Sequence, residues 1–210
     1  MVSVEFKILI LVLISVVIGL FSYPLMPDVM ASHWNDVGEV NGYMPKFWGV
    51  FLMPAISILL GFLLVLIPKL DPLNKNVEKF RKYFDNFILL LLVFFIYIYV
   101  FTLLWNAGIK IDIVTVLIPA LSVLFYYTGV MIEHAKMNWF IGIRTPWTLS
   151  SEKVWDKTHK MGGKLFKLAS IIILSGLLLK NWAIIILLIT IIPTTIYLVI
   201  YSYIEYKKLK

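Results

Sequence analysis

The 210-residue chain contains no cysteine and carries few charged residues. Without cysteine it has no disulfide bond, no thiolate nucleophile and no cysteine-ligated metal. Only 15% of the residues are charged, whereas 61% are hydrophobic. Such a composition is typical of a membrane protein and leaves no room for a separate soluble domain. We therefore predict a single polytopic membrane domain over residues 1–210.

Ionisable side chains are missing from the middle of six long apolar runs. These runs are Phe6–Tyr23, Phe47–Ile67, Phe84–Leu104, Ile113–Ile132, Leu165–Leu179 and Ala183–Tyr203. Because roughly 20 apolar residues cross a hydrocarbon core of about 30 Å, the runs predict an all-α integral membrane protein, a six-transmembrane helix bundle. Ion-coupled carriers usually hold ionisable groups near the midplane of the membrane. Their absence weakens the alternative of a small-solute transporter.

The lysines and arginines fall mainly on alternate connections between these runs. One lies at Lys7, five between positions 69 and 82, seven between positions 136 and 167, and three in the tail after position 206. Lys46, Lys110 and Lys180 lie on the other connections. The positive-inside rule therefore predicts that both termini are cytoplasmic and that the protein is a multi-pass protein of the plasma membrane. The net charge of +7 then indicates contact with the lipid bilayer rather than direct nucleic-acid binding.

This topology divides the chain into four parts. Residues 1–67 hold two spans and an external loop, and residues 68–132 hold spans three and four. Residues 133–164 form a cytoplasmic loop with an interfacial helix, and residues 165–210 hold spans five and six. Ser150 or Ser151 can cap the interfacial helix, whose first turn carries Glu152. We expect Gly162 and Gly163 to bend the chain between this helix and the fifth span.

The external loop between positions 23 and 46 gathers polar groups and an indole. Proline, glycine and an Asn-Gly pair predict a structured loop with tight turns. An imidazole, an indole and a carboxamide in a row can hold a polar or peptide ligand at the membrane surface. An interfacial anchor is the alternative. The candidate ligand- or toxin-binding residues are His33, Trp34, Asn35, Gly38, Asn41 and Gly42.

The same loop carries potential metal ligands in His33, Asp36 and Glu39. However, it has only one histidine, its acidic residues are isolated, and no His-Glu-x-x-His pattern occurs. We therefore predict no metal, no other cofactor and no catalytic residue. A membrane-embedded enzyme using His33 or His159 remains an alternative, because either imidazole can act as an acid or base.

The cytoplasmic loop holds a second cluster rich in tryptophan. Its central residue is Arg144, which can stack on an indole and donate up to five hydrogen bonds. The cluster either binds a cytoplasmic partner or clamps the loop to the helices, and the residue types do not separate these roles. The candidate residues for the two roles are Asn138, Trp139, Gly142, Arg144, Thr145, Pro146, Trp147, Trp155 and His159.

The two clusters together resemble the SdpI family. The resemblance covers nearly the whole chain and rests on two motifs. They are Pro27…His33-Trp34-Asn35…Gly38…Asn41-Gly42-Tyr43 and Asn138-Trp139-Phe140-x-Gly142-x-Arg144-Thr145-Pro146-Trp147-Thr148-Leu149-Ser150…Val154-Trp155…Thr158-His159…Gly162-Gly163.

What the resemblance implies is a membrane immunity protein that confers resistance to a secreted, sporulation-delaying toxin peptide. It also implies signal transduction, in which a cytoplasmic transcriptional repressor is captured at the membrane when the toxin binds. Transferred by position, the His33 loop would sense the toxin outside the cell, and the region from Arg144 to His159 would hold the repressor inside.

Overall fold

The computed structural model describes residues 2–35 and 38–209 of the chain. Asp36, which the sequence suggested as a metal ligand, lies outside these residues. The helices are α1 (Val4–Ser22), α2 (Lys46–Leu70), α3 (Asn74–Glu78), α4 (Arg81–Asn106), α5 (Ile113–His134), α6 (Pro146–Leu149), α7 (Glu152–Leu174) and α8 (Ala183–Lys207), and the strands are β1 (Val29–Trp34) and β2 (Val40–Pro45). Short 3-10 turns at Tyr23–Leu25, Ser175–Leu177 and Lys180–Trp182 complete the regular structure.

Five helical segments of the described chain are long and apolar enough to cross a membrane. They are Val4–Leu25, Lys46–Leu70, Arg81–Asn106, Ile113–His134 and Lys180–Lys207. An all-α membrane protein is therefore confirmed, and each of these segments coincides with a predicted run. The fifth predicted run, Leu165–Leu179, is not among them, so a sixth crossing stays a prediction.

The fifth run differs because it belongs to a longer amphipathic helix. Helix α7 continues from Glu152 to Leu174, with Gly162 and Gly163 inside it. The predicted bend at these glycines is therefore wrong, whereas the division of α7 into an interfacial part and a fifth span stays a prediction. The glycines serve packing instead, since a Cβ on Gly163 would lie 2.9 Å from the Gly129 carbonyl oxygen of α5.

The chain forms two compact units. The first comprises Met1–Leu64 and Ile88–Ala120, and the second comprises Val65–Phe87 and Leu121–Lys210. This division is finer than the single domain predicted from composition. Each candidate cluster of the sequence lies within one unit, the His33 cluster in the first and the Arg144 cluster in the second.

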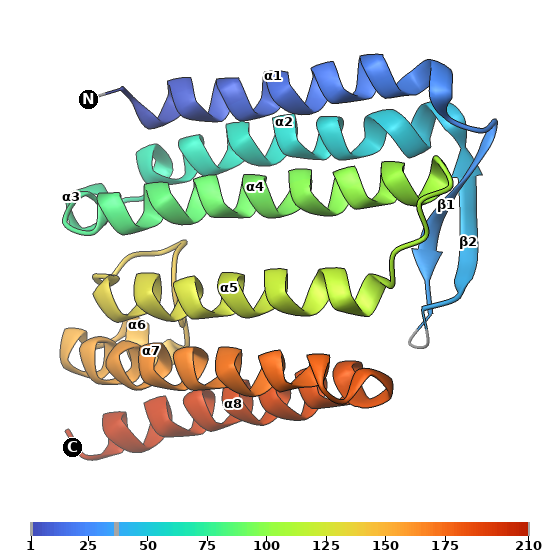
Figure 1. Cartoon of the computed structure of the whole chain (residues 1–210). Helices are drawn as coiled ribbons and strands as arrows, with labels where there is room; N and C mark the ends of the chain where they lie inside the picture. Colours follow the sequence, from blue (N-terminus) through green and yellow to red (C-terminus); the bar gives the residue numbers. More distant parts are fainter. Residues whose placement is uncertain (1, 36–37, 210) are drawn as a thin grey trace. The chain divides into compact units, whose positions relative to one another are not determined.

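In the first unit, α1, α2 and α4 run side by side and the strands pack at one end of them (Figure 1). The core at that end is a cluster of buried apolar side chains that joins the strands to the helices. Its members are Met26, Met30, Val50, Tyr99 and Leu103. Met30 is fully buried, and it lies against Gly49, where any side chain would collide with it. A small residue at the start of α2 thus allows β1 to approach the helix closely.

The two strands form an antiparallel hairpin where the sequence predicted a structured loop with tight turns. Val29 pairs with Pro45 and Trp34 with Val40, and the register shifts on either side of His33. Pro45 falls at the last position of β2, where its missing N–H costs little. The strands are short, and glycine, proline and asparagine lie in and around them. The alternation of inward and outward side chains that marks a strand was therefore not evident in the sequence.

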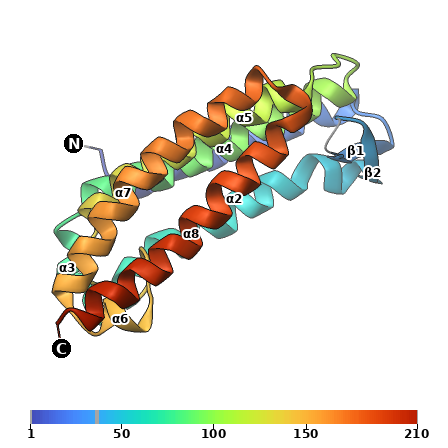
Figure 2. The same ribbon diagram turned by 90° about the horizontal axis from the view of Figure 1, so that it is seen from below.

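In the second unit, α7 and α8 form a helical hairpin (Figure 2). An ion-pair network joins them, because the buried Glu205 carboxylate of α8 binds both Lys157 of α7 and Lys208. Helix α5 packs on α7 through the Gly129–Gly163 contact and through an ion pair between Glu133 and Lys167 at 2.5 Å.

Candidate functional site

His33 and Asn41 face each other across the hairpin. The His33 Nδ1 and Asn41 Oδ1 atoms lie 2.5 Å apart, and both side chains are exposed. Because an amide oxygen only accepts, this contact places a proton on Nδ1. His33 is thus held at the surface of the hairpin in a defined orientation, with its other ring nitrogen free of that contact.

Asn35, Gly38 and Gly42, which were also candidates for ligand binding, shape the hairpin. The Asn35 Oδ1 accepts a hydrogen bond from the Glu39 backbone N–H at 2.8 Å. Gly38 has a φ of 83°, a conformation that favours glycine. A Cβ on Gly42 would lie 2.8 Å from the Cβ of His33. These three residues therefore determine the backbone conformation of the hairpin. Among the candidate residues, His33 and Asn41 remain as the exposed polar pair.

Trp34 joins the hairpin to α4 through an aromatic contact. Its ring meets Trp105 edge to face, with centroids 5.6 Å apart. The Lys110 ammonium lies 3.1 Å from the centroid of the same Trp105 ring. The indole Nε1 of Trp34 is buried and has no hydrogen-bond partner in the described chain. Trp34 thus ties the hairpin to α4, while its predicted roles in ligand binding or as an anchor at the membrane interface stay predictions.

Asn106, which the sequence did not single out, fastens β1 to the end of α4. Its Oδ1 accepts from the Ala31 N–H at 2.8 Å, and its Nδ2 donates to the Ala31 carbonyl at 3.1 Å. The side-chain amide therefore replaces a neighbouring strand at that edge. Sequence spacing holds no signal for a pair of residues that lie 75 positions apart.

In the second unit, Asn138 organises the start of the motif loop. Its Nδ2 donates to the carbonyls of Lys136 and Ile141, and its Oδ1 accepts from the N–H groups of Phe140 and Ile141, all at 2.6–2.9 Å. Asn138 is completely buried. All the hydrogen bonds of this amide are internal, so it builds the loop and has no capacity left for a partner.

Thr145 and Thr148 form a capping box at the start of α6. The Thr148 Oγ1 donates to the Ile143 carbonyl at 2.8 Å, and the Thr145 Oγ1 lies 3.0 Å from the Ser202 Oγ of α8. Pro146 occupies the first turn of α6, where a missing N–H costs nothing. This short helix is therefore fixed both to its own loop and to α8.

Trp155 and His159 hold the middle of the loop against α7. Their rings stack with centroids 3.9 Å apart, and both are buried. The Trp155 Nε1 donates to the Ala135 carbonyl at 2.8 Å. The His159 Nδ1 donates to the Trp155 carbonyl at 2.9 Å, and its Nε2 accepts from the Ile143 N–H at 3.0 Å. Gly142, with a φ of 117°, gives the ring its space.

Burial lowers the pKa of His159 to about 4. The hydrogen bonds agree with this, because a second ring proton would point at the Ile143 N–H, which is itself a donor. A neutral, buried imidazole with both nitrogens engaged has no free position for acid–base chemistry. In addition, the described residues hold no group of three histidine or acidic side chains placed for a metal.

Two residues of the α2–α4 connection, also missed in the sequence, support the loop. The buried Asp71 carboxylate accepts from the Trp139 N–H at 2.9 Å, and the Asn76 Nδ2 donates to the Met137 carbonyl at 2.9 Å. The second unit therefore braces the loop from two sides, through α7 and through the segment around α3.

The side chains that the loop presents outward are few. Trp139 is 52% exposed and Phe140 is 43% exposed, and Arg144 and Pro146 are also exposed. Arg144 Nη1 donates to the Trp139 carbonyl at 2.8 Å, a contact within the loop, so the choice between a clamp to the helices and a partner contact stays open. Trp147 packs against Tyr203 of α8, with centroids 5.1 Å apart. The motif thus combines buried residues that build the loop with exposed ones, among which Trp139, Phe140 and Arg144 offer two aromatic rings and a guanidinium.

Long apolar helices, a charged loop braced on one unit and a hairpin at the end of the other define a multi-pass plasma-membrane protein. Residues 134–202 match the model of the SdpI/YfhL protein family, and residues 10–58 match a domain of unknown function, DUF1648. The Immunity protein SdpI of Bacillus subtilis (strain 168) is 23% identical over 202 residues, which cover 96% of this chain and 95% of that protein. The chain is thus similar to the SdpI family, through its last third in the family model and through nearly its whole length in the relative. No solved structure matches it.

Proposed function

We propose that this protein is an SdpI-like membrane immunity protein that binds a membrane-active toxin peptide at the hairpin. The observation that carries the proposal is the resemblance to an immunity protein along 96% of the chain. The hairpin and the motif loop both lie within that length, and both are built from residues that the sequence motifs contain. Binding alone would protect the membrane, since a sequestered peptide does not insert into lipid.

An apolar groove beside the hairpin supports a peptide-binding role. It has a volume of about 190 Å³ and lies between the end of α1 and the end of α4, with Leu25, Met26 and Leu103 in its lining. Met26 and Leu103 also belong to the core that holds β1. An amphipathic peptide can place apolar side chains in such a groove while His33 and Asn41 meet its polar groups.

The test is protection of cells that lack an immunity protein of their own against the purified sporulation-delaying toxin peptide. We expect wild-type protein to preserve survival and membrane potential. His33→Ala and Leu25→Ser should reduce protection at equal membrane abundance. Val29→Ala removes an exposed apolar side chain of β1 outside the candidate set and should protect fully. Full protection by both His33→Ala and Leu25→Ser would refute this end of the first unit as the toxin site.

We further propose that the motif loop captures a cytoplasmic transcriptional repressor when toxin is bound. The exposed Trp139, Phe140 and Arg144 support this role, because exposed aromatic and arginine side chains are typical of interface hot spots. Their rigid backing by Asn138 lowers the entropy cost of binding.

The test uses a fluorescently tagged helix-turn-helix repressor, provided that the gene neighbourhood encodes one. It should move to the membrane when toxin is added to cells with the wild-type protein, and Arg144→Ala or Trp139→Ala should abolish the movement. Lys153→Ala, at an exposed position of α7, is the matched control. If Arg144→Ala instead prevents membrane insertion, Arg144 is only a clamp for the loop.

A further inference from the structure

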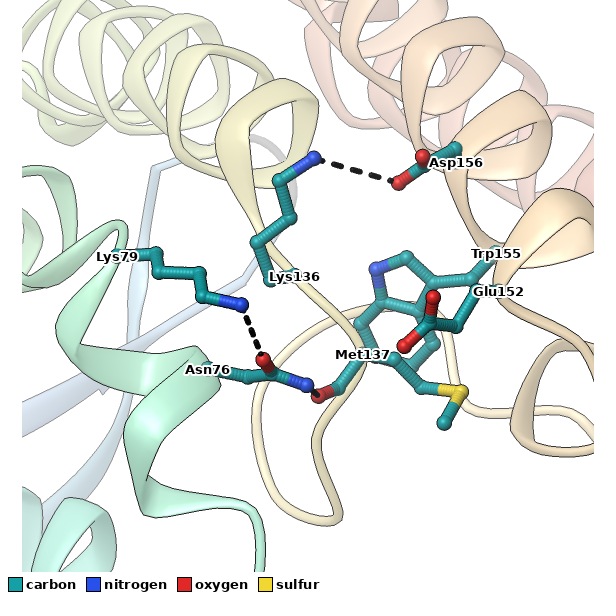
Figure 3. Close-up of a pocket in the computed structure, with 7 residues that line it drawn as sticks. All are labelled: Asn76, Lys79, Lys136, Met137, Glu152, Trp155 and Asp156. Atoms are coloured by element: carbon teal, nitrogen blue, oxygen red, sulfur yellow. Dashed lines mark hydrogen bonds and ion pairs between the residues drawn. The ribbon is translucent and has the colours of Figure 1, made fainter.

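A polar cavity of about 170 Å³ lies in the second unit, apart from the exposed residues of the motif loop. Three segments line it, namely α3, the chain just after α5, and the first turns of α7 (Figure 3). Its charged lining consists of two lysines, Lys79 and Lys136, and two carboxylates, Glu152 and Asp156. The formal charges therefore balance, with both signs present around one small space.

The contacts among the lining side chains leave much of their charge available to a ligand. The Lys79 ammonium is bound to the neutral Asn76 amide at 2.9 Å, and Lys136 and Asp156 form a loose pair at 3.6 Å. Lys136 and Asp156 are each about half exposed. Glu152 lies in the first turn of α7, and its carboxylate points toward the space beside Met137 (Figure 3). A ligand can replace these weak contacts at little cost.

The position of the cavity along the chain relates it to the membrane boundary. Lys79 lies two residues before the candidate span Arg81–Asn106, and Lys136 lies two residues after the candidate span Ile113–His134. Lysines at the ends of spans reach the level of lipid headgroups. The indole of Trp155 lies on the α7 side of the cavity, beside Glu152 and Asp156 (Figure 3). Its N–H is already bound to the Ala135 carbonyl and so does not compete for a ligand.

We propose that this cavity binds a phosphoethanolamine group, with the phosphate on Lys79 and Lys136 and the primary ammonium on Glu152 and Asp156. A zwitterion with a donor-bearing amine satisfies both pairs. An anionic headgroup without an amine meets two carboxylates, and a choline group cannot donate hydrogen bonds to them. The same chemistry is present in phosphatidylethanolamine and in soluble glycerophosphoethanolamine. The site is independent of the immunity role, so either can fail alone.

The test is native mass spectrometry of the full-length protein in detergent with equimolar phosphatidylethanolamine, phosphatidylcholine and phosphatidylglycerol. We expect wild-type protein to retain phosphatidylethanolamine preferentially. Lys79→Gln and Lys136→Gln should each weaken its retention about two- to fivefold, the value of one partly exposed charge contact. Glu152→Gln should reduce the preference over the other two lipids. Lys82→Gln, an exposed lysine of the same connection that does not line the cavity, should leave retention unchanged.

Soluble glycerophosphoethanolamine, titrated into the same samples, separates the two sources. Displacement of the lipid shows that the headgroup determines binding, whereas binding of the soluble compound with no lipid preference assigns the site to a free phosphoethanolamine. Arginine variants at positions 79 and 136 keep the charge and should retain binding if the glutamine variants prove unstable. Equal retention of the three lipids together with no binding of the soluble compound would overturn the proposal, as would an unchanged preference in both glutamine variants.

Discussion

At the scale of single residues, His159 illustrates how a residue suited to catalysis serves structure. Its residue type suggested an acid, a base or a partner contact, but its hydrogen-bond partners depend on the path of the backbone around it. The Ile143 N–H and the Trp155 carbonyl take both ring nitrogens. No local pattern in the sequence gives that path, so the role of His159 could not be predicted from its neighbours.

The lowered pKa of His159 predicts a loss of stability in acid. Its pKa falls from 6.5 to about 4 on folding because burial disfavours the imidazolium. A group with a depressed pKa stabilises the fold in its deprotonated form, so this contribution is complete above pH 6.5 and is lost as the pH falls toward 4. The full difference amounts to about 3 kcal/mol. Thermal unfolding in detergent, followed by tryptophan fluorescence, should show this loss.

His159→Gln is the variant that isolates this effect. It should be less stable than wild type at neutral pH but should change less between pH 6.5 and pH 4. His33→Gln, at an exposed position, should follow the wild-type pH profile. Parallel profiles for wild type and His159→Gln would contradict the assignment.

Asn138 supports a second prediction at this scale. Asn138→Ala leaves two N–H groups and two carbonyls of the loop without their partner. We expect the free energy of unfolding to fall by on the order of 3 kcal/mol and residues 136–142 to become sensitive to proteases. Asn181→Ala, at an exposed site, should change stability by less than about 0.5 kcal/mol. Equal protease resistance of the two variants would show that Asn138 does not hold the loop.

At the scale of elements, the sequence predicted long helices well and the hairpin poorly. An apolar run of about 20 residues has few alternatives to a membrane helix. The strands β1 and β2 depend instead on a distant amide, that of Asn106, and on burial of Met30 beside Gly49. The adjoining glycines of α7 were likewise interpreted as a bend, because close helix packing and chain flexibility favour the same residue type.

The packing role of these glycines can be tested by a matched pair. A methyl group on Gly163 would meet the backbone of α5 at Gly129, whereas one on Gly162 would meet the movable tip of Ile143. We expect Gly163→Ala to lower stability by about 1–3 kcal/mol through overpacking. Gly162→Ala should stay within about 1 kcal/mol of wild type, since alanine also favours the helix. Equal melting temperatures for the two variants would contradict the close contact of α5 and α7.

At the scale of the whole molecule, the number of crossings decides where the termini lie. Five spans place them on opposite sides of the membrane, whereas a sixth crossing by the apolar end of α7 places both on one side. The charge distribution predicted both termini inside, which requires the sixth crossing. Hydropathy alone does not decide this, because α7 combines a lysine-rich start with an apolar end.

The absence of cysteine makes this topology directly testable. Single cysteines at Tyr43, Lys153 and Asn181, all exposed, report the side of the hairpin, the motif loop and the α7–α8 connection. We expect a membrane-impermeant maleimide to label Tyr43→Cys and Asn181→Cys in intact cells and Lys153→Cys only after permeabilisation. Labelling of Asn181→Cys only after permeabilisation would show five crossings and opposite termini.

The bond between Ala31 and Asn106 also sets a delay in biogenesis. The ribosome adds about 5–20 residues per second, so the 75 residues between the two partners take roughly 4–15 s to synthesise. During that interval the edge of β1 has no Asn106 to bind, although α1 and α2 have already been made. The hairpin is therefore completed only after α4 has been synthesised, and a nascent chain arrested before residue 106 should expose Ala31 to hydrogen exchange.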